Sequence, residues 1–358
     1  MELGEGVLAK PSEVVHGQRE LPLLTVQSYS LPLKDGSKFI GDRASGTEFR
    51  EILSRHRGLA SAFGPKPFGS EKTVDIDSKK LDGALAKDRT NPEKRTIERS
   101  VEEFAEQFTS VLLRFLQTPE WSGTERVVCG GGLSQGDVGE EVFGRVETLL
   151  RGSYPSIEVK RLHHHPDEAG MIGWAFVAPA YVLAQGNGFL AIDIGGTNLR
   201  WGIVRVNGPT DDAGSYSVVC KDKWCHAEDN VSRDDVVERM ALELRRAADA
   251  AGSRGVTLAP FIGLSCPGLV SPDGRILRGV QNLPGDWSDD DFLFPDRIAD
   301  QVGMIGGAVP TVLLHNDAVI QALSDAPLMV GVERWAAVTL GTGLGNCSFA
   351  NRTVRPCP

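Results

Sequence analysis

The chain lacks the features that mark membrane, secreted and nucleic-acid-binding proteins. No apolar run approaches the roughly 20 residues that span a bilayer. The N-terminus has no basic start followed by an apolar core, so a signal peptide is not predicted. The net charge of −10 at pH 7 would repel a polyanion. We therefore expect a cytoplasmic protein with no membrane and no nucleic-acid partner.

Cysteine is scarce and poorly arranged for metal binding. The six cysteines are scattered, and none forms a C-x-x-C pair. Cys220 and Cys225 lie near each other, but no second pair or histidine couple completes a zinc site around them. The spacing therefore predicts reduced thiols and no structural zinc.

The rest of the composition is that of a globular protein. At 358 residues, 41% of them hydrophobic, the chain is long enough for two domains. Strand-like runs alternate with helical patterns, which is typical of an α/β fold. The strongest helix pattern begins at Asn91 and repeats apolar residues at three- and four-residue steps through Leu116. Residues 63–90, broken by glycine and proline, predict a solvated loop, and the apolar residues 168–184 predict a buried helix despite Pro179.

Residues 190–206 (LAIDIGGTNLRWGIVRV) hold the most informative pattern. Two β-rich runs flank a glycine turn, which predicts a tight hairpin. Gly195 and Gly196 let the backbone approach a ligand closely, and their amides with the Thr197 hydroxyl could wrap phosphate oxygens. Asp193, at the strand end, is placed to hold a hydrated Mg²⁺. An ordinary hairpin with a solvated acid is the alternative on this stretch alone.

A second glycine hairpin is predicted at residues 341–345 (GTGLG), and two such turns suggest two lobes that hold phosphates from opposite sides. Between them Asp317 follows a strand, where the sites of α/β proteins collect. A carboxylate there can accept the proton of a hydroxyl that attacks a γ-phosphate. Alternatively, Asp317 is the N-cap of the next helix, since Asn and Asp both favour that position.

Taken together, five segments resemble the ROK-type sugar kinases and glucokinases. DIGGTNLR, SCPGLVSPDGRI, NLPGDW, HND and TLGTGLG occur in the order of that family between Phe189 and Phe349. The resemblance implies the two-lobed hexokinase, actin and Hsp70 ATPase fold, with ATP, Mg²⁺ and a sugar as ligands. It implies Asp317 as catalytic base and Asp193 at the metal, through water. The implied sugar contacts are Asn282, Asn316 and Asp317, and the implied ATP contacts are Asp193, Gly195, Gly196, Thr197, Asn198, Gly341, Thr342, Gly343 and the loop Gly130, Gly131 and Gly132.

The order of the segments departs from the family. In ROK kinases roughly half the protein follows the second hairpin. Here, segments that resemble the family's adenosine loop (ERVVCGGGLS, 125–134) and closing helix precede the first hairpin. We infer a circular permutation: residues 1–187 with 330–358 form the nucleotide lobe, and residues 188–329 form the lobe with the DxGGT hairpin and the sugar site. A truncated kinase with an unrelated N-terminal domain is the alternative.

Two signatures of the family are missing, and one of them is the cysteine-rich zinc motif. The E-x-G-H motif, whose glutamate and histidine contact the sugar, is absent, and Glu48 is the nearest positional match. The leading hypothesis is ATP-dependent phosphorylation of a sugar hydroxyl. The alternative is a sugar-sensing or regulatory protein that kept the fold and lost turnover. Some relatives are DNA-binding repressors, but no N-terminal helix-turn-helix is predicted here. A homodimer is one option for assembly.

Overall fold

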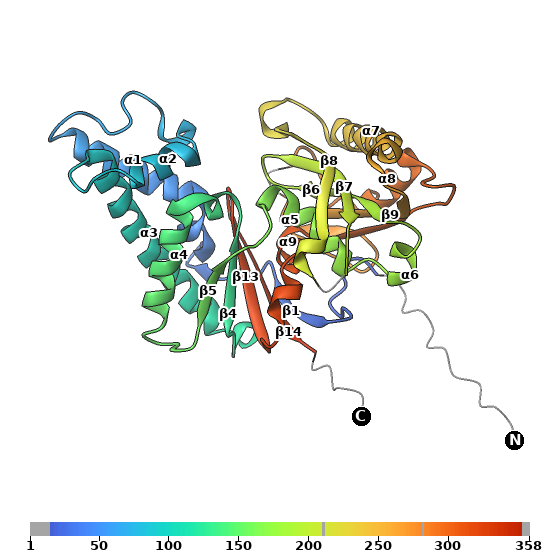
Figure 1. Cartoon of the computed structure of the whole chain (residues 1–358), viewed down its shortest axis with the longest axis horizontal. Helices are drawn as coiled ribbons and strands as arrows, with labels where there is room; N and C mark the ends of the chain where they lie inside the picture. The colour runs from blue at the N-terminus through green and yellow to red at the C-terminus, as the bar shows by residue number, and fades with distance from the viewer. Residues whose placement is uncertain (1–14, 210–211, 281–282, 353–358) are drawn as a thin grey trace, which may run out of the picture.

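Two five-stranded mixed sheets, one in each of two lobes, organise the chain (Figure 1). This computed structural model describes residues 15–209, 212–280 and 283–352. Helices pack on both faces of each sheet, and the predicted two-lobed α/β class is confirmed. Among the described residues, no helix is long and apolar enough to cross a membrane.

The first sheet carries the predicted DIGGT hairpin. Its order is β12-β9-β6-β7-β8, and β6 is antiparallel to β7 but parallel to β9. Every residue of β6 is buried, because α7 (Arg233–Ala251) and α8 (Phe294–Val302) cover one face while α5 (Pro166–Ile172) and α9 (Asp317–Leu323) cover the other. The strands are β6 (Gly188–Ile194), β7 (Leu199–Val206), β8 (Tyr216–Trp224), β9 (Leu258–Cys266) and β12 (Thr311–Asn316).

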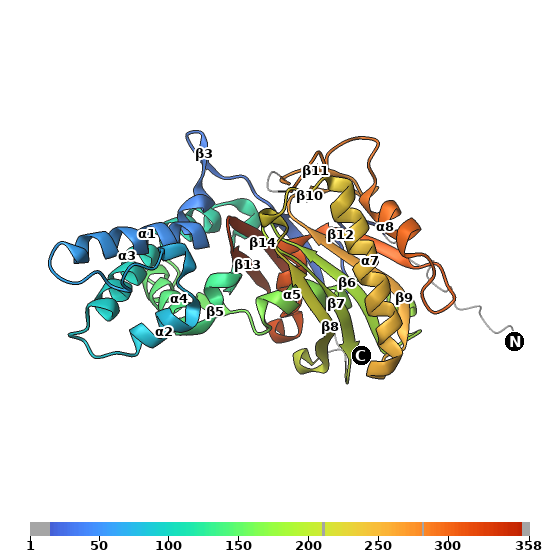
Figure 2. The ribbon, with the colours of Figure 1, turned by 90° about the horizontal axis from the view of Figure 1, so that it is seen from above.

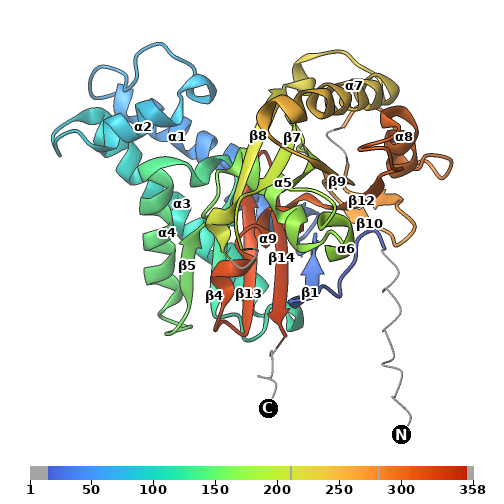
Figure 3. The same cartoon turned by 45° about the vertical axis from the view of Figure 1, so that its right-hand side comes forward.

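The second sheet carries the other predicted glycine turn. Its order is β1-β14-β13-β4-β5, with β13 antiparallel to β14 and parallel to β4. Helices α1 (Gly46–Ser61), α3 (Pro92–Leu116) and α4 (Gly136–Leu150) cover its outer face. Helix α9 packs on the other face and so lies between the two sheets (Figure 3). The strands are β1 (Leu24–Tyr29), β4 (Arg126–Gly130), β5 (Glu158–Arg161), β13 (Arg334–Leu340) and β14 (Leu344–Asn351).

Both sheets share one strand pattern. In each, the central strand (β6 or β13) leads through a glycine turn into an antiparallel neighbour, and two parallel strands follow on its other side. The outer antiparallel position is held by β8 in the first sheet and by β1 in the second. Leu24 at the start of β1 lies opposite Asn351 at the end of β14. The two sheets therefore differ in chain order but not in arrangement.

Short hairpins project from both lobes near the boundary between them (Figure 2). They are formed by β2 (Lys34–Asp35) with β3 (Lys38–Phe39) and by β10 (Leu269–Val270) with β11 (Ile276–Arg278). The helix predicted to begin at Asn91 is confirmed as α3. The Asn91 side chain caps its N-terminus by accepting the N–H of Glu93 at 2.9 Å.

The structure corrects two local expectations. Residues 63–90 are not only loop, because Asp77 caps α2 (Ser78–Leu85), which buries Leu81 against the second lobe's core. The helix expected at 168–184 breaks into α5 and α6 (Ala180–Leu183), since Pro179 lacks an N–H and disfavours helical geometry in the residue before it. Helix α5 lies before residue 187 in the chain and packs on the first sheet.

Candidate active site

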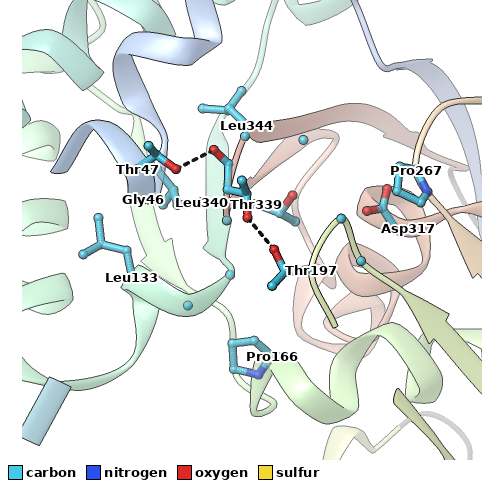
Figure 4. Close-up of a pocket in the computed structure, with 18 of the residues that line it drawn as sticks. Gly46, Thr47, Leu133, Pro166, Thr197, Pro267, Asp317, Thr339, Leu340 and Leu344 are labelled. Carbon is cyan, nitrogen blue, oxygen red and sulfur yellow. Dashed lines mark hydrogen bonds between the residues drawn. The ribbon is translucent and has the colours of Figure 1, made fainter. Parts of the chain in front are cut away.

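A cleft of about 1450 Å³ lies between the two lobes. Most of the residues that the sequence nominates line it, so the fold brings together side chains from opposite ends of the chain. Figure 4 shows Asp317 and Pro267 on one side of this cleft and Thr47 and Leu133 on the other. The predicted residues that line the cleft are Asp193, Gly195, Gly196, Thr197, Asn198, Gly131, Gly132, Asn316, Asp317, Gly341, Thr342 and Gly343.

Of the nominated residues that the structure describes, two are not among those lining the cleft. Asn282 lies outside the described residues. Glu48 is in the first turn of α1, where its N–H bonds to the Ser45 hydroxyl, and the structure does not bring its carboxylate together with Asp317. Gly130 ends β4, and a Cβ there would lie 2.5 Å from Oε1 of Gln321, so this glycine permits close packing against α9.

The two glycine turns meet across the cleft. We name residues 195–198 the first turn and residues 341–343 the second turn. The hydroxyls of Thr197 and Thr342 are 3.1 Å apart. The second turn is anchored from α1, because the Thr47 hydroxyl donates to the Thr342 carbonyl at 2.9 Å and the Gly46 N–H donates to the Gly341 carbonyl at 2.8 Å. Both turns are therefore fixed within reach of one ligand.

Backbone N–H groups at both turns are left without partners. Within residues 15–209, 212–280 and 283–352, no hydrogen bond uses the N–H of Gly196, Thr197 or Asn198, or that of Thr342 or Gly343. Successive unpaired N–H groups in a turn form a concave site for an anion. The two turns together thus provide donors suited to phosphate oxygens.

The glycine segment at residues 130–132 packs against the strand that leads into the second turn. Gly131 has φ of +86°, a conformation that residues with a Cβ rarely adopt. A Cβ at this position would also lie 2.5 Å from the backbone nitrogen of Leu340, the last residue of β13. Glycine is therefore required here by both conformation and space, and the loop after β4 can pack directly against the strand that leads into the second turn.

Asp317 is the first residue of α9 and not its cap. The cap is Asn316, whose side-chain oxygen accepts the N–H of Val319 at 3.2 Å. This removes the cap interpretation of Asp317. Burial, and then the charge of Asp193, raise the pKa of Asp317 from 3.8 to about 7. A carboxyl group with a pKa near 7 can both accept and release a proton at neutral pH.

The side chain of Asn316 lines the cleft but is already engaged. Its amide nitrogen donates to the Gly268 carbonyl at 2.9 Å and to the Ser30 hydroxyl at 3.2 Å. These bonds tie the loop after β9 to the end of β1, and so join the two lobes beside Asp317. The expected contact between Asn316 and a sugar hydroxyl remains a prediction.

Asp193 is the last residue but one of β6 and is tightly packed. Only 6% of the residue is exposed, and a Cβ on Gly170 of α5 would lie 2.6 Å from its carboxyl carbon. Arg200, which stands opposite Asp193 in the hairpin, places Nη1 3.4 Å from Oδ2 and donates from Nε to Asp167 at 2.5 Å. Burial raises the pKa of Asp193, and the charge of Arg200 opposes that shift. Arg200 was not predicted from the sequence, although the antiparallel pairing of β6 with β7 places it opposite Asp193.

The donor set fits a phosphate-bound Mg²⁺ better than a metal held by protein alone. In the part of the chain that the structure describes, no group of three or more His, Cys, Asp or Glu side chains could hold an ion. Mg²⁺ in phosphotransferases commonly takes one or two carboxylates, with phosphates and water completing its shell. Asp193 in the cleft is the carboxylate that would serve, directly or through water.

Comparison with known proteins points to one family. No family model matches the chain. A curated glucokinase of Thermotoga maritima is 27% identical over 158 residues, which are 44% of this chain and 42% of the relative. The chain resembles the ROK-type sugar kinases.

Solved structures of sugar kinases also match part of the chain. They include the ROK hexokinase from Thermus thermophilus (25% identity, TM-score 0.32, 44% of this chain and 45% of that one). A putative N-acetylmannosamine kinase from Listeria monocytogenes matches at 24% identity with a TM-score of 0.33, over 46% of this chain and 47% of that one. The chain spans less than half the length of each of these relatives.

Proposed function

We propose that this protein transfers the γ-phosphoryl group of ATP to a hydroxyl group of a sugar. One observation carries the proposal. Asp317, with its pKa raised to about 7, shares a cleft with two glycine turns whose N–H groups are unpaired. A base for a hydroxyl and a cradle for phosphates are the two parts that such a transfer needs.

The residues of the cleft divide the chemistry between them. The carboxylate of Asp317 accepts the hydroxyl proton as the sugar oxygen forms its bond to the γ-phosphorus. The bond from that phosphorus to the bridging oxygen breaks, and ADP leaves with the electron pair. The N–H groups of the two turns hold the phosphate oxygens in line for this displacement. Mg²⁺ bound near Asp193 would offset part of the phosphate charge.

The position of α9 supports a role for lobe closure. This helix begins at Asp317, and its buried side chains pack against both sheets. A movement of one lobe toward the other would therefore act directly on the position of the base. Closure around the sugar would also exclude water, which limits wasteful hydrolysis of ATP.

A sugar-sensing protein without turnover is the second candidate. Two observations favour it: the amide of Asn316 is occupied by protein partners, and Glu48 is not among the residues that line the cleft. The position of Asp317 in the same cleft as both glycine turns favours the enzyme, since a sensor needs no general base.

We also propose that the chain order is circularly permuted, with residues 1–187 and 330–358 equivalent to the nucleotide lobe of the ROK kinases. The matching strand patterns of the two sheets support this. If a short loop joined β14 to β1 at the Asn351–Leu24 pair, the second sheet would acquire the chain order of the first.

A coupled ADP-release assay tests the proposed activity. Mg-ATP is supplied with a panel of hexoses and N-acetylhexosamines, to the wild type, to Asp317→Asn and to a control, Asp300→Asn, on the exposed surface of α8. We expect sugar-dependent turnover that falls by roughly 10²- to 10⁴-fold in Asp317→Asn and is unchanged in the control. Folded protein that binds a sugar but releases no ADP with any of the panel would favour the sensor.

A further inference from the structure

We infer that His226 is a positioning residue that orients the phosphate-binding N–H groups of the first turn; this inference rests on the proposed function. His226 opens the short 3₁₀ helix His226–Glu228 between β8 and α7. It is buried, with 2% exposure, and is not among the residues that line the cleft. Its Nε2 lies 3.0 Å from the carbonyl oxygen of Gly195. Because a carbonyl can only accept, Nε2 carries the hydrogen and donates it.

Holding this carbonyl fixes the direction of an N–H group. The carbonyl of Gly195 and the N–H of Gly196 belong to one planar peptide unit, and in a trans peptide they point in opposite directions. No described peptide bond is cis. His226 lies behind the turn, whereas Gly195 and Gly196 line the cleft. A carbonyl that points back to His226 therefore directs the Gly196 N–H toward the space where phosphate would lie.

The residue after His226 makes a parallel contact. The Ala227 N–H donates to the Thr197 carbonyl at 3.4 Å. By the same peptide geometry this directs the Asn198 N–H away from the loop after β8. Two of the three peptide units of the first turn, the first and the third, are thus held by one short segment of chain.

His226 also replaces a hydrogen bond that would close the turn. The Gly195 N–H donates to the Asn198 carbonyl at 2.8 Å, as in a tight hairpin. In an ordinary β-turn the Gly195 carbonyl would in return accept the Asn198 N–H. Among the described residues that return bond is absent, and the imidazole takes the carbonyl instead. The Asn198 N–H is consequently left free for a ligand.

Three variants separate this role from general support of the loop. His226→Phe keeps an aromatic ring but removes the donor, and His226→Gln restores an N–H donor. Trp224→Phe is the matched control, because it removes a donor beside His226, the bond from Nε1 to Asp229, and keeps an aromatic ring at the edge contact with the His226 ring. Should His226→Phe fail to fold, His226→Leu provides a smaller side chain without a donor.

The measurement is calorimetric binding of Mg-ATP and, separately, of a sugar that the wild type phosphorylates, together with steady-state kinetics. In the donor-less variants we expect the Kd and KM for Mg-ATP to rise roughly fivefold to tenfold, the loss of one hydrogen bond. The Kd for sugar should stay within twofold. His226→Gln should recover most of the ATP affinity, and Trp224→Phe should match the wild type.

The outcomes distinguish this inference from the proposed function. Wild-type protein that binds no Mg-ATP would overturn the proposed function, and the inference with it. Wild-type protein that binds Mg-ATP, with donor-less variants that bind it equally well, would overturn the inference alone. Equal weakening of sugar and ATP binding would reduce His226 to a structural role and would also overturn it.

Discussion

Replacing Asp317 by asparagine should stabilise the protein at alkaline pH while it lowers activity by roughly 10²- to 10⁴-fold. The pKa of Asp317 is raised from 3.8 to about 7, mainly by burial. The folded state therefore holds a proton that the unfolded chain releases, and stability contributed by this group falls as the pH rises from about 4 to about 7. Above that range the ionised carboxylate is destabilising, and the asparagine variant avoids this cost.

The size of the effect follows from the pKa. The full shift corresponds to roughly 4 kcal/mol between the two protonation states. Because solvent reaches part of the residue, we expect roughly 1 to 4 kcal/mol in practice. Asp317 accepts a hydrogen bond from the Ala318 N–H at 2.8 Å, and the side-chain oxygen of asparagine can accept the same bond. The substitution therefore leaves the Ala318 N–H with its partner.

The assay is chemical unfolding of the wild type and of Asp317→Asn at pH 8 and at pH 4. Asp325 also has its pKa raised to about 7 by burial, but it is present in both proteins and cancels in the difference. We expect the variant to have the higher unfolding free energy at pH 8 and little advantage at pH 4. A variant that is equally or less stable at pH 8 would refute the assignment of Asp317 as a strained buried base.

Three further predictions follow from the same geometry. As the pH increases, the kcat/KM for sugar should rise to a plateau with an apparent pKa of about 7. Asp193→Asn should shift this rise to lower pH, because it removes a negative charge beside Asp317. A pH–rate profile of each protein checks both predictions. Gly131→Ala, at φ of +86° and without space for a Cβ, should lower the unfolding free energy by roughly 1 to 3 kcal/mol, which thermal unfolding measures. Thr47→Val removes one donor to the second turn and should raise the KM for ATP severalfold without changing the KM for sugar, as steady-state kinetics would register.

Local chemistry explains which parts of the fold were predictable from the sequence. Asn91 indicates where α3 begins, because its side chain caps the first turn of the helix. The apolar repeat to Leu116 predicts which face of the helix is buried. The β6–β7 hairpin follows from two apolar runs around two glycines. By contrast, α2 has a short apolar pattern, and its Leu81 is buried only because α3 and α4 lie beside it.

The candidate site also contains residues that the sequence predicts and residues that it does not. Asp193, Asp317 and the glycine turns stand in segments whose types and order carry a family resemblance. His226 does not: its role depends on where the loop after β8 lies behind the first turn, which no spacing in the sequence reveals. Glu48 was chosen by position in the chain, and α1 places it near the charges of Glu51, Arg55 and Glu103 and not among the residues that line the cleft.

The most direct test of phosphoryl transfer to a sugar is ³¹P NMR of the protein incubated with Mg-ATP and each sugar of the panel. We predict a phosphate-ester resonance that grows in equal amount with ADP for at least one sugar, and that is absent with Asp317→Asn. Folded wild-type protein that yields only inorganic phosphate with ADP, or no change in ATP with any sugar, would contradict the proposed function.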